Sequence, residues 1–168
     1  MNEDRRYPIG RFEKLDVLTE SQRAEHSDSI ARMPAEFRRL AEELGPARLA
    51  KPYREGGWTG LQVAHHVADS HMNAYIRFKW ALTEDKPILK AYDQEAWVRL
   101  PDATAPADSA LRLLEAVHGK WVSLLRGLGA EDFRKEITHP ESGLWTLDAL
   151  LALYEWHGRH HLAHLWLL

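Results

Sequence analysis

The sequence contains no cysteine. A chain without cysteine forms no disulfide bond, offers no thiolate to a metal ion and has no cysteine nucleophile. Any thiol chemistry would therefore use a thiol supplied from outside the protein. The absence of disulfides also fits a reducing compartment, and we expect a cytoplasmic protein.

Long apolar runs and an excess of charge of one sign are absent as well. No segment approaches the roughly 18 consecutive apolar residues of a membrane-spanning helix, and no apolar stretch typical of a signal peptide follows the charged residues 1–6. Lysine and arginine total 22 against 25 aspartates and glutamates, which gives a formal net charge of −3. Because there is no basic cluster, we expect neither nucleic acid nor a membrane as the main partner.

Several common catalytic motifs are also missing. The sequence has no glycine-rich phosphate loop, no Gly-x-Ser-x-Gly elbow and no His-Glu-x-x-His. Apolar residues make up 45% of the 168 positions, and seven residues are tryptophan. This composition is sufficient for a buried core, so we expect one folded domain over residues 1–168.

Apolar residues at spacings of three and four predict four long amphipathic helices. Thr19 and Thr59 each precede a glutamine by three residues and so fit capping boxes, while Pro34 should kink or split the first helix. The expected helices run from Thr19 to Gly45, from Thr59 to about Leu82, from Asp108 to Gly127 or Gly129, and from Thr146 to the C-terminus, with a short helix near 93–98 and a weak hairpin signal at 134–138. The sequence thus predicts an all-α four-helix bundle with long connections.

Histidine is concentrated in two of these helices. Seven of the ten histidines fall in two short segments: His65, His66 and His71 in the second helix, and His157, His160, His161 and His164 in the last. Imidazole is the commonest protein ligand for zinc and similar metals, and residues at i and i+4 share one face of a helix. One such pair with a third histidine from another helix would hold a tetrahedral metal ion and leave one position open.

On the second helix the spacing favours His66 over His65. His66, Asp69 and Asn73 share one face, and Asp69 or Asn73 could hold the second ring nitrogen of His66. His65 points well away, because successive residues turn by about 100°. On the last helix, spacing alone allows either His157 with His161 or His160 with His164.

Short strings along nearly the whole chain resemble the YfiT-like branch of the DinB superfamily. They are Tyr7-Pro8-Ile9-Gly10, Pro52-Tyr53-Arg54-Glu55-Gly56-Gly57-Trp58-Thr59, His65-His66-Val67-Ala68-Asp69-Ser70-His71-Met72-Asn73, Tyr75-Ile76-Arg77-Phe78-Lys79, Pro87-x5-Asp93, His139-Pro140-Glu141 and Tyr154-x-Trp156-His157-x-x-His160-His161. The resemblance implies a DinB-type four-helix bundle, commonly a homodimer, with one Zn²⁺ or Ni²⁺ per subunit. Its metal ligands would be His66, His157 and His161, and the other clustered histidines would be their neighbours.

The resemblance also implies an activity on a small-molecule substrate. Members of this branch are described as metal-dependent hydrolases. For this chain we expect that the metal would activate water and that Asp69 or a nearby group would shuttle protons. Related DinB proteins are thiol S-transferases that use low-molecular-weight thiols such as bacillithiol, and this alternative stays open. A third alternative is a non-catalytic bundle that uses the metal as a structural clamp.

Overall fold

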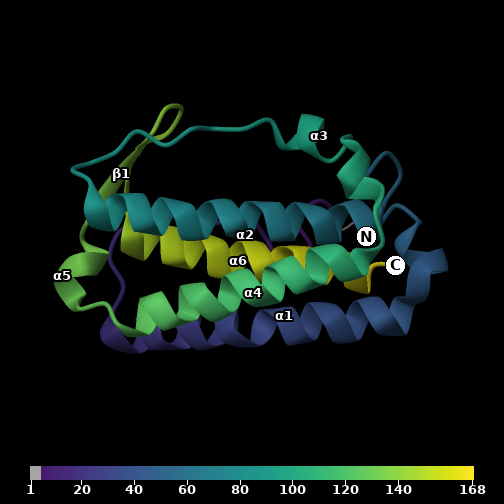
Figure 1. Cartoon of the computed structure of the whole chain (residues 1–168), viewed down its shortest axis with the longest axis horizontal. Helices are drawn as coiled ribbons and strands as arrows, with labels where there is room; N and C mark the ends of the chain where they lie inside the picture. The colour runs from purple at the N-terminus through teal and green to yellow at the C-terminus, as the bar shows by residue number, and fades with distance from the viewer. Residues whose placement is uncertain (1–4) are drawn as a thin grey trace.

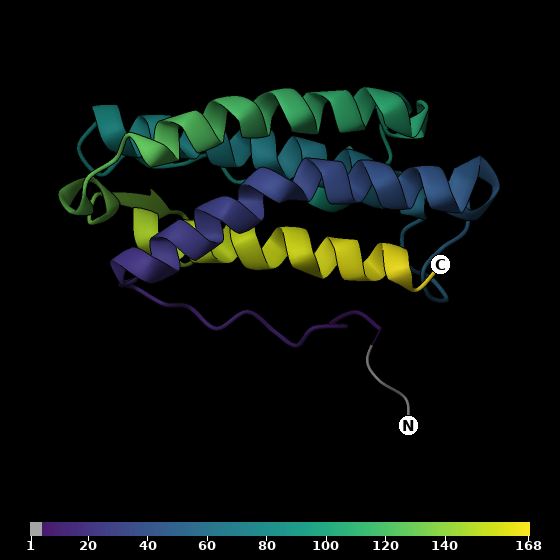
Figure 2. The same ribbon diagram turned by 90° about the horizontal axis from the view of Figure 1, so that it is seen from below.

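Four long helices lie side by side in the computed structural model, which describes residues 5–168 (Figures 1 and 2). They are α1 (Glu20–Leu49), α2 (Gly60–Thr83), α4 (Ala107–Arg126) and α6 (Leu147–Trp166). The shorter elements are α3 (Gln94–Trp97), the 3-10 helix η1 (Pro101–Thr104), α5 (Ala130–Phe133) and a hairpin of β1 (Glu136–His139) and β2 (Gly143–Thr146). The predicted four-helix bundle is confirmed, and the hairpin lies a few residues beyond its weak signal. In the described part of the chain, no helix is long and apolar enough to cross a membrane.

The predicted capping residues begin three of the long helices. In α2, the Thr59 hydroxyl accepts from the backbone N–H of Gln62 at 3.2 Å, and the Gln62 side chain accepts from the Thr59 N–H at 2.9 Å. The same box opens α1 at Thr19, and Thr146 caps α6. These caps satisfy N–H groups that would otherwise have no partner in the first turn.

The first helix is interrupted at Gly45 rather than at Pro34. Gly45 adopts φ 67° and ψ 169°, a left-handed conformation that glycine tolerates and that separates the last turn of α1 from the rest. Pro34 does not split the helix, although the axis of α1 changes direction in its middle part (Figure 2). The predicted split at Pro34 is therefore wrong, and the helix bends in this region instead.

The long connection between α2 and α4 determines the direction of the helices. It runs from residue 84 back along the bundle to residue 106, so that α4 points the same way as α2 while α1 and α6 run in the opposite direction (Figure 1). Each of α1 and α2 packs against both α4 and α6, whereas α1 and α2 lie diagonally opposite. The hairpin holds the connection in place, because Leu89 donates to the Thr138 carbonyl at 3.0 Å and Thr138 donates to the Pro87 carbonyl at 2.9 Å.

Large apolar side chains fill the centre of the bundle. Trp121, Phe37 and Phe78 are completely buried, and burial of such residues contributes most of the stabilisation of the fold. At Gly158, a Cβ atom would approach the sulfur of Met33 to 1.9 Å and a ring carbon of His71 to 3.3 Å. The absence of a side chain at this position therefore allows α6 to lie close against α1.

A buried ion pair attaches the N-terminal segment and α1 to α6. The Arg23 guanidinium donates to both carboxylate oxygens of Asp148 at 2.7 Å, and the Leu18 N–H donates to the same carboxylate at 3.1 Å. Asp148 is only 1% exposed. From there, the segment that precedes α1 runs back along α6 (Figure 2), which brings residues 6 and 7 to the opposite end of the bundle.

We predict that Asp148→Ala lowers the free energy of unfolding by roughly 3 kcal/mol or more, because it leaves the Arg23 charge without its partner. Chemical denaturation monitored by circular dichroism measures this change. The matched control is Glu131→Ala, which removes the exposed ion pair with Arg134 and should cost less than about 1 kcal/mol. Equal losses in the two variants would contradict the role given to the buried pair.

Candidate metal centre

Three histidines meet where the start of α2 lies beside the second half of α6. His66 comes from α2, and His157 and His161 come from successive turns of α6. One ring nitrogen from each lies within 4.8 Å of the others, and the Nε2 atoms of His66 and His157 are 3.2 Å apart. Three imidazole nitrogens at this spacing can bind a single metal ion.

Burial keeps these imidazoles in the neutral form that binds metals. Burial lowers the pKa of His66 from 6.5 to about 4, with His160 and His164 as smaller causes. Burial also holds the pKa of His157 and of His161 well below 6.5. A neutral imidazole offers a free electron pair at one nitrogen, so the group is ready to bind a cation near neutral pH.

A second histidine group overlaps the first. His160, His161 and His164 also bring one nitrogen each within 4.8 Å of the others. In this group, Nε2 of His164 donates to the carbonyl of Arg6 at 3.3 Å, and Nδ1 of His164 lies 3.2 Å from Nδ1 of His161. Because a carbonyl only accepts, Nδ1 of His164 is left to accept from His161, and Nε2 of His161 keeps its free electron pair. These contacts favour His164 as the orienting partner of His161.

A pocket of about 430 Å³ opens beside the histidines. Trp58 forms one wall, with its ring centroid 4.7 Å from that of His66, and its indole N–H donates to Glu95 at 3.2 Å. Tyr53 stacks on His164 with ring centroids 4.0 Å apart. Arg54 also lines the pocket. The candidate centre is therefore reached from an aromatic pocket that carries charged groups on its walls.

The other polar residues of α2 that the sequence singled out lie elsewhere. Asp69 is half-buried and does not line the pocket. Burial raises the pKa of its carboxyl, and the nearby Asp102 adds to the rise. Asn73 donates to the backbone carbonyl of Asp69 at 2.9 Å, within its own helix. His65 points away from His66, as expected, and its Nε2 lies 2.9 Å from the Ala105 carbonyl.

Sequence reasoning missed His118 and the pocket walls. Nε2 of His118, on α4, lies 2.8 Å from Nδ1 of His71, and Nε2 of His71 lies 3.2 Å from Nδ1 of His157. His118 falls between Leu114 and Trp121 on the apolar face of its helix, and a polar residue at such a position was the available signal. Tyr53 and Arg54 belong to a string that carries the family resemblance, but that string gave no role to them; they reach the pocket from a loop.

The fold is shared with solved bundle proteins. YfiT from Bacillus subtilis, described as a probable metal-dependent hydrolase with an unusual four-helix bundle topology, superposes with a TM-score of 0.94 at 41% identity, over 97% of this chain and 94% of that one. TT2238, a four-helix bundle protein, matches with a TM-score of 0.59 at 21% identity over 83% of this chain. The second likeness shows the fold alone.

Sequence comparisons identify the family. The model of the DinB superfamily matches residues 29–165. Proteins from Bacillus mycoides (strain KBAB4) and Bacillus anthracis, each named "putative metal-dependent hydrolase", are 48% identical over 162 residues, which cover 96% of this chain and 94% of theirs. The chain belongs to the DinB superfamily, and its relatives are YfiT-like proteins.

The buried histidines predict a stability that falls with acidification. His66 and His118 have pKa values of about 4 in the folded protein against 6.5 unfolded, so between these values the unfolded chain binds more protons. Each of these histidines should lower the free energy of unfolding by up to about 1.4 kcal/mol per pH unit as the pH falls below 6.5. Urea unfolding of the chelator-treated protein from about pH 7 to pH 5 measures the slope. A free energy of unfolding that stays constant over this interval would contradict the assignment of buried neutral histidines.

Proposed function

We propose that this protein is a metal-dependent hydrolase with one zinc or nickel ion held by His66, His157 and His161. The observation that carries the proposal is the convergence of three ring nitrogens, two of them from one face of α6, at the base of an open pocket. Metal dependence is also part of the printed description of YfiT and of the Bacillus relatives.

The chemistry of the donor set fits a borderline divalent cation. All three groups are imidazoles, which suit zinc and nickel, and the chain has no cysteine that could complete a closed thiolate site. His157 and His161 each face a second histidine through their other nitrogen. A hydrogen bond at that nitrogen orients a ligating ring, as a carboxylate, a carbonyl or water usually does. A metal ion held by three neutral histidines supplies a charge of +2 and lowers the pKa of bound water to about 7.

The residues of the pocket would bind and enclose the substrate. Trp58 and Tyr53 offer apolar faces, and Arg54 places a guanidinium at the same pocket. Glu95 is held by the Trp58 indole, which fixes a carboxylate at the pocket rim. These groups suit a small molecule with an apolar part and a polar group, bound with its reactive centre next to the three histidines.

A thiol S-transferase remains the second candidate. The observation in its favour is the combination of an open three-histidine site with a chain that has no cysteine, so that a thiol would have to enter through the pocket. The expected homodimer and the cytoplasmic location stay predictions.

We predict that His66→Ala, His157→Ala and His161→Ala each weaken zinc binding by more than about 100-fold, because loss of a ligand exceeds the usual 10- to 100-fold effect of losing its outer partner. Competition with a coloured chelator measures the affinity, and mass spectrometry of the metal measures the content. The control is His65→Gln, which changes the neighbouring histidine outside the group. If His161→Ala bound zinc like the wild type, the ligand assignment would be wrong.

The reaction is tested on the metal-loaded wild type. Ester and amide substrates should be hydrolysed only with metal present, and the His161→Ala variant should lose at least about 100-fold in rate, in line with its lost metal. A parallel assay measures conjugation of monochlorobimane with bacillithiol. Conjugation without hydrolysis would overturn the hydrolase proposal in favour of the transferase. Bound metal with neither activity, together with a raised melting temperature, would identify a structural clamp.

A further inference from the structure

Three histidines connect the candidate metal centre to the opposite side of the bundle. From His157, a line of close ring contacts leads through His71 to His118, with nitrogen–nitrogen distances of 3.2 Å and 2.8 Å. It ends where Nδ1 of His118 lies 2.7 Å from the backbone carbonyl of Ile30, on α1. His71 is completely buried and His118 is 2% exposed. We call these three residues the histidine chain.

The carbonyl at the end determines the position of every proton in the histidine chain. A carbonyl oxygen only accepts, so Nδ1 of His118 carries the hydrogen and Nε2 must accept from Nδ1 of His71. Nε2 of His71 must then accept from Nδ1 of His157. That leaves the free electron pair of His157 on Nε2, the nitrogen that faces Nε2 of His66.

The direction of the histidine chain follows because its members are neutral. His71 and His118 are buried inside the bundle, where a neutral ring costs much less to bury than an unpaired charge. A neutral imidazole has one donor and one acceptor nitrogen. Once the donor nitrogen of one ring is fixed, the donor nitrogen of the next ring is fixed as well. If His118 carried its hydrogen on Nε2 instead, the free electron pair of Nδ1 would face the Ile30 oxygen. Two buried acceptors in contact without a hydrogen between them are costly.

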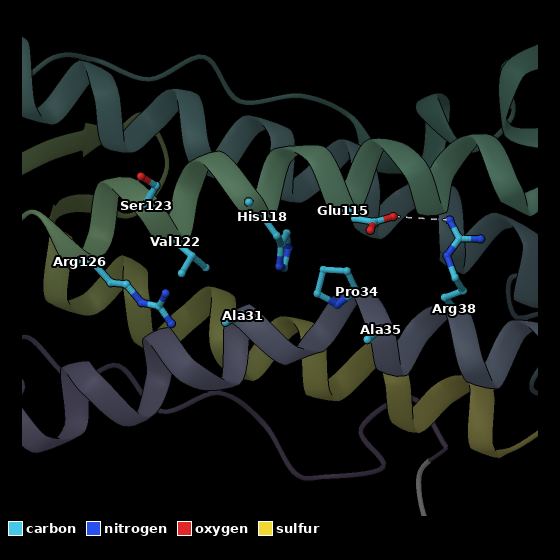
Figure 3. Close-up of a pocket in the computed structure, with 10 residues that line it drawn as sticks. Ala31, Pro34, Ala35, Arg38, Glu115, His118, Val122, Ser123 and Arg126 are labelled. Atoms are coloured by element: carbon cyan, nitrogen blue, oxygen red, sulfur yellow. Dashed lines mark ion pairs between the residues drawn. The ribbon is translucent and has the colours of Figure 1, made fainter.

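Pro34 explains why the Ile30 carbonyl is available. In an α-helix, the N–H of residue 34 would donate to the carbonyl of residue 30, and proline has no N–H to donate. Figure 3 shows His118 of α4 pointing toward α1, with Pro34 beside it. Both residues line a hollow of about 570 Å³ between the two helices. The proline within α1, which is unfavourable for the helix itself, thus leaves a free acceptor for His118.

The packing around the histidine chain keeps the rings in register. The rings of His71 and His118 are nearly parallel, at 4°, with centroids 5.0 Å apart. Trp121 meets both rings edge-on, with centroid distances of 5.9 Å to each. Gly158 lets α6 approach, since a Cβ there would lie 3.3 Å from the His71 ring. The rings therefore have little room to rotate into another hydrogen-bonding pattern.

We propose that His118 is a positioning residue for the metal centre: anchored on the Ile30 carbonyl, it acts through His71 to fix the tautomer of His157. This inference rests on the proposed function, because it takes His157 as a metal ligand. It assigns a role to two histidines and one proline that lie outside the ligand set. None of the three touches the metal or the substrate pocket.

The test compares His118→Gln with His118→Asn. A glutamine amide can reach the place of Nε2 and accept from His71, whereas an asparagine amide reaches only the place of Nδ1 and keeps just the bond to Ile30. We expect Asn to weaken zinc binding by about 10- to 100-fold and Gln to restore most of it. Val122→Ala, which removes buried volume at the same hollow one turn away, is the packing control and should leave the affinity unchanged.

Nitrogen-15 NMR of the metal-free protein gives a readout that does not depend on metal. In the wild type and in His118→Gln, the ring shifts of His157 should show a single tautomer with hydrogen on Nδ1, and in His118→Asn a mixture. A wild-type His157 with hydrogen on Nε2, or an unchanged tautomer and affinity in His118→Asn, would overturn the proposal. So would a loss in Val122→Ala as large as in His118→Asn. If the wild type bound no zinc, the proposed function would fail, while the NMR result would still decide the direction of the histidine chain.

Discussion

A buried neutral imidazole must donate from one nitrogen and accept at the other, and the interior of this bundle is organised around that constraint. Seven histidines are buried and His157 is partly buried, and close ring contacts join five of these eight into two hydrogen-bonded lines. One line ends on the Ile30 carbonyl and the other on the Arg6 carbonyl. Both begin at a histidine of the candidate centre. The polar network is therefore satisfied by the backbone at its far ends, and its free electron pairs are directed toward the metal.

The order and direction of the helices make this arrangement possible. Because the connection from residue 84 to residue 106 returns along the bundle, α2 and α4 run in parallel, and His118 lies at the height of His71. Since α6 runs opposite to α2, its second half meets the start of α2, where His66 lies. A bundle with short connections between successive antiparallel helices would not bring these three helices together in this way.

Much of the architecture could be predicted from local sequence. The Thr-x-x-Gln boxes mark the true beginnings of α1 and α2, and the apolar spacing gives four helices, because both signals act within one or two turns. The break at Gly45 agrees with the predicted end of the first helix, because glycine followed by proline is a local signal. The tolerance of Pro34 could not be predicted, because it depends on whether a distant group uses the carbonyl that the proline leaves free. The role of His118 could not be predicted for the same reason: its place on an apolar helix face marks it as unusual, but its partners are 47 and 88 residues away.

The site illustrates the same limit. Helical spacing predicts that His66 differs from its neighbour His65, and the contacts of His65 with Ala105 agree. Spacing does not choose between His157 with His161 and His160 with His164 on α6. The choice between these pairs depends on which ring nitrogen the hydrogen-bond partners of each histidine leave free. Asp69 shares a helical face with His66 in projection, yet the packing of η1 sets it next to Asp102 instead. Side-chain partners across helices decide these roles, and they follow from the fold rather than from the local sequence.

The most direct test of the metal centre is a crystal structure of the zinc-loaded protein with anomalous diffraction at the zinc edge. We predict a single ion per chain, at about 2.0–2.1 Å from one nitrogen each of His66, His157 and His161, with a further position open toward the pocket. The nitrogen of His157 that binds should be Nε2, with Nδ1 facing His71. An ion bound instead by His160, His161 and His164, or one closed by a fourth protein ligand, would contradict the account.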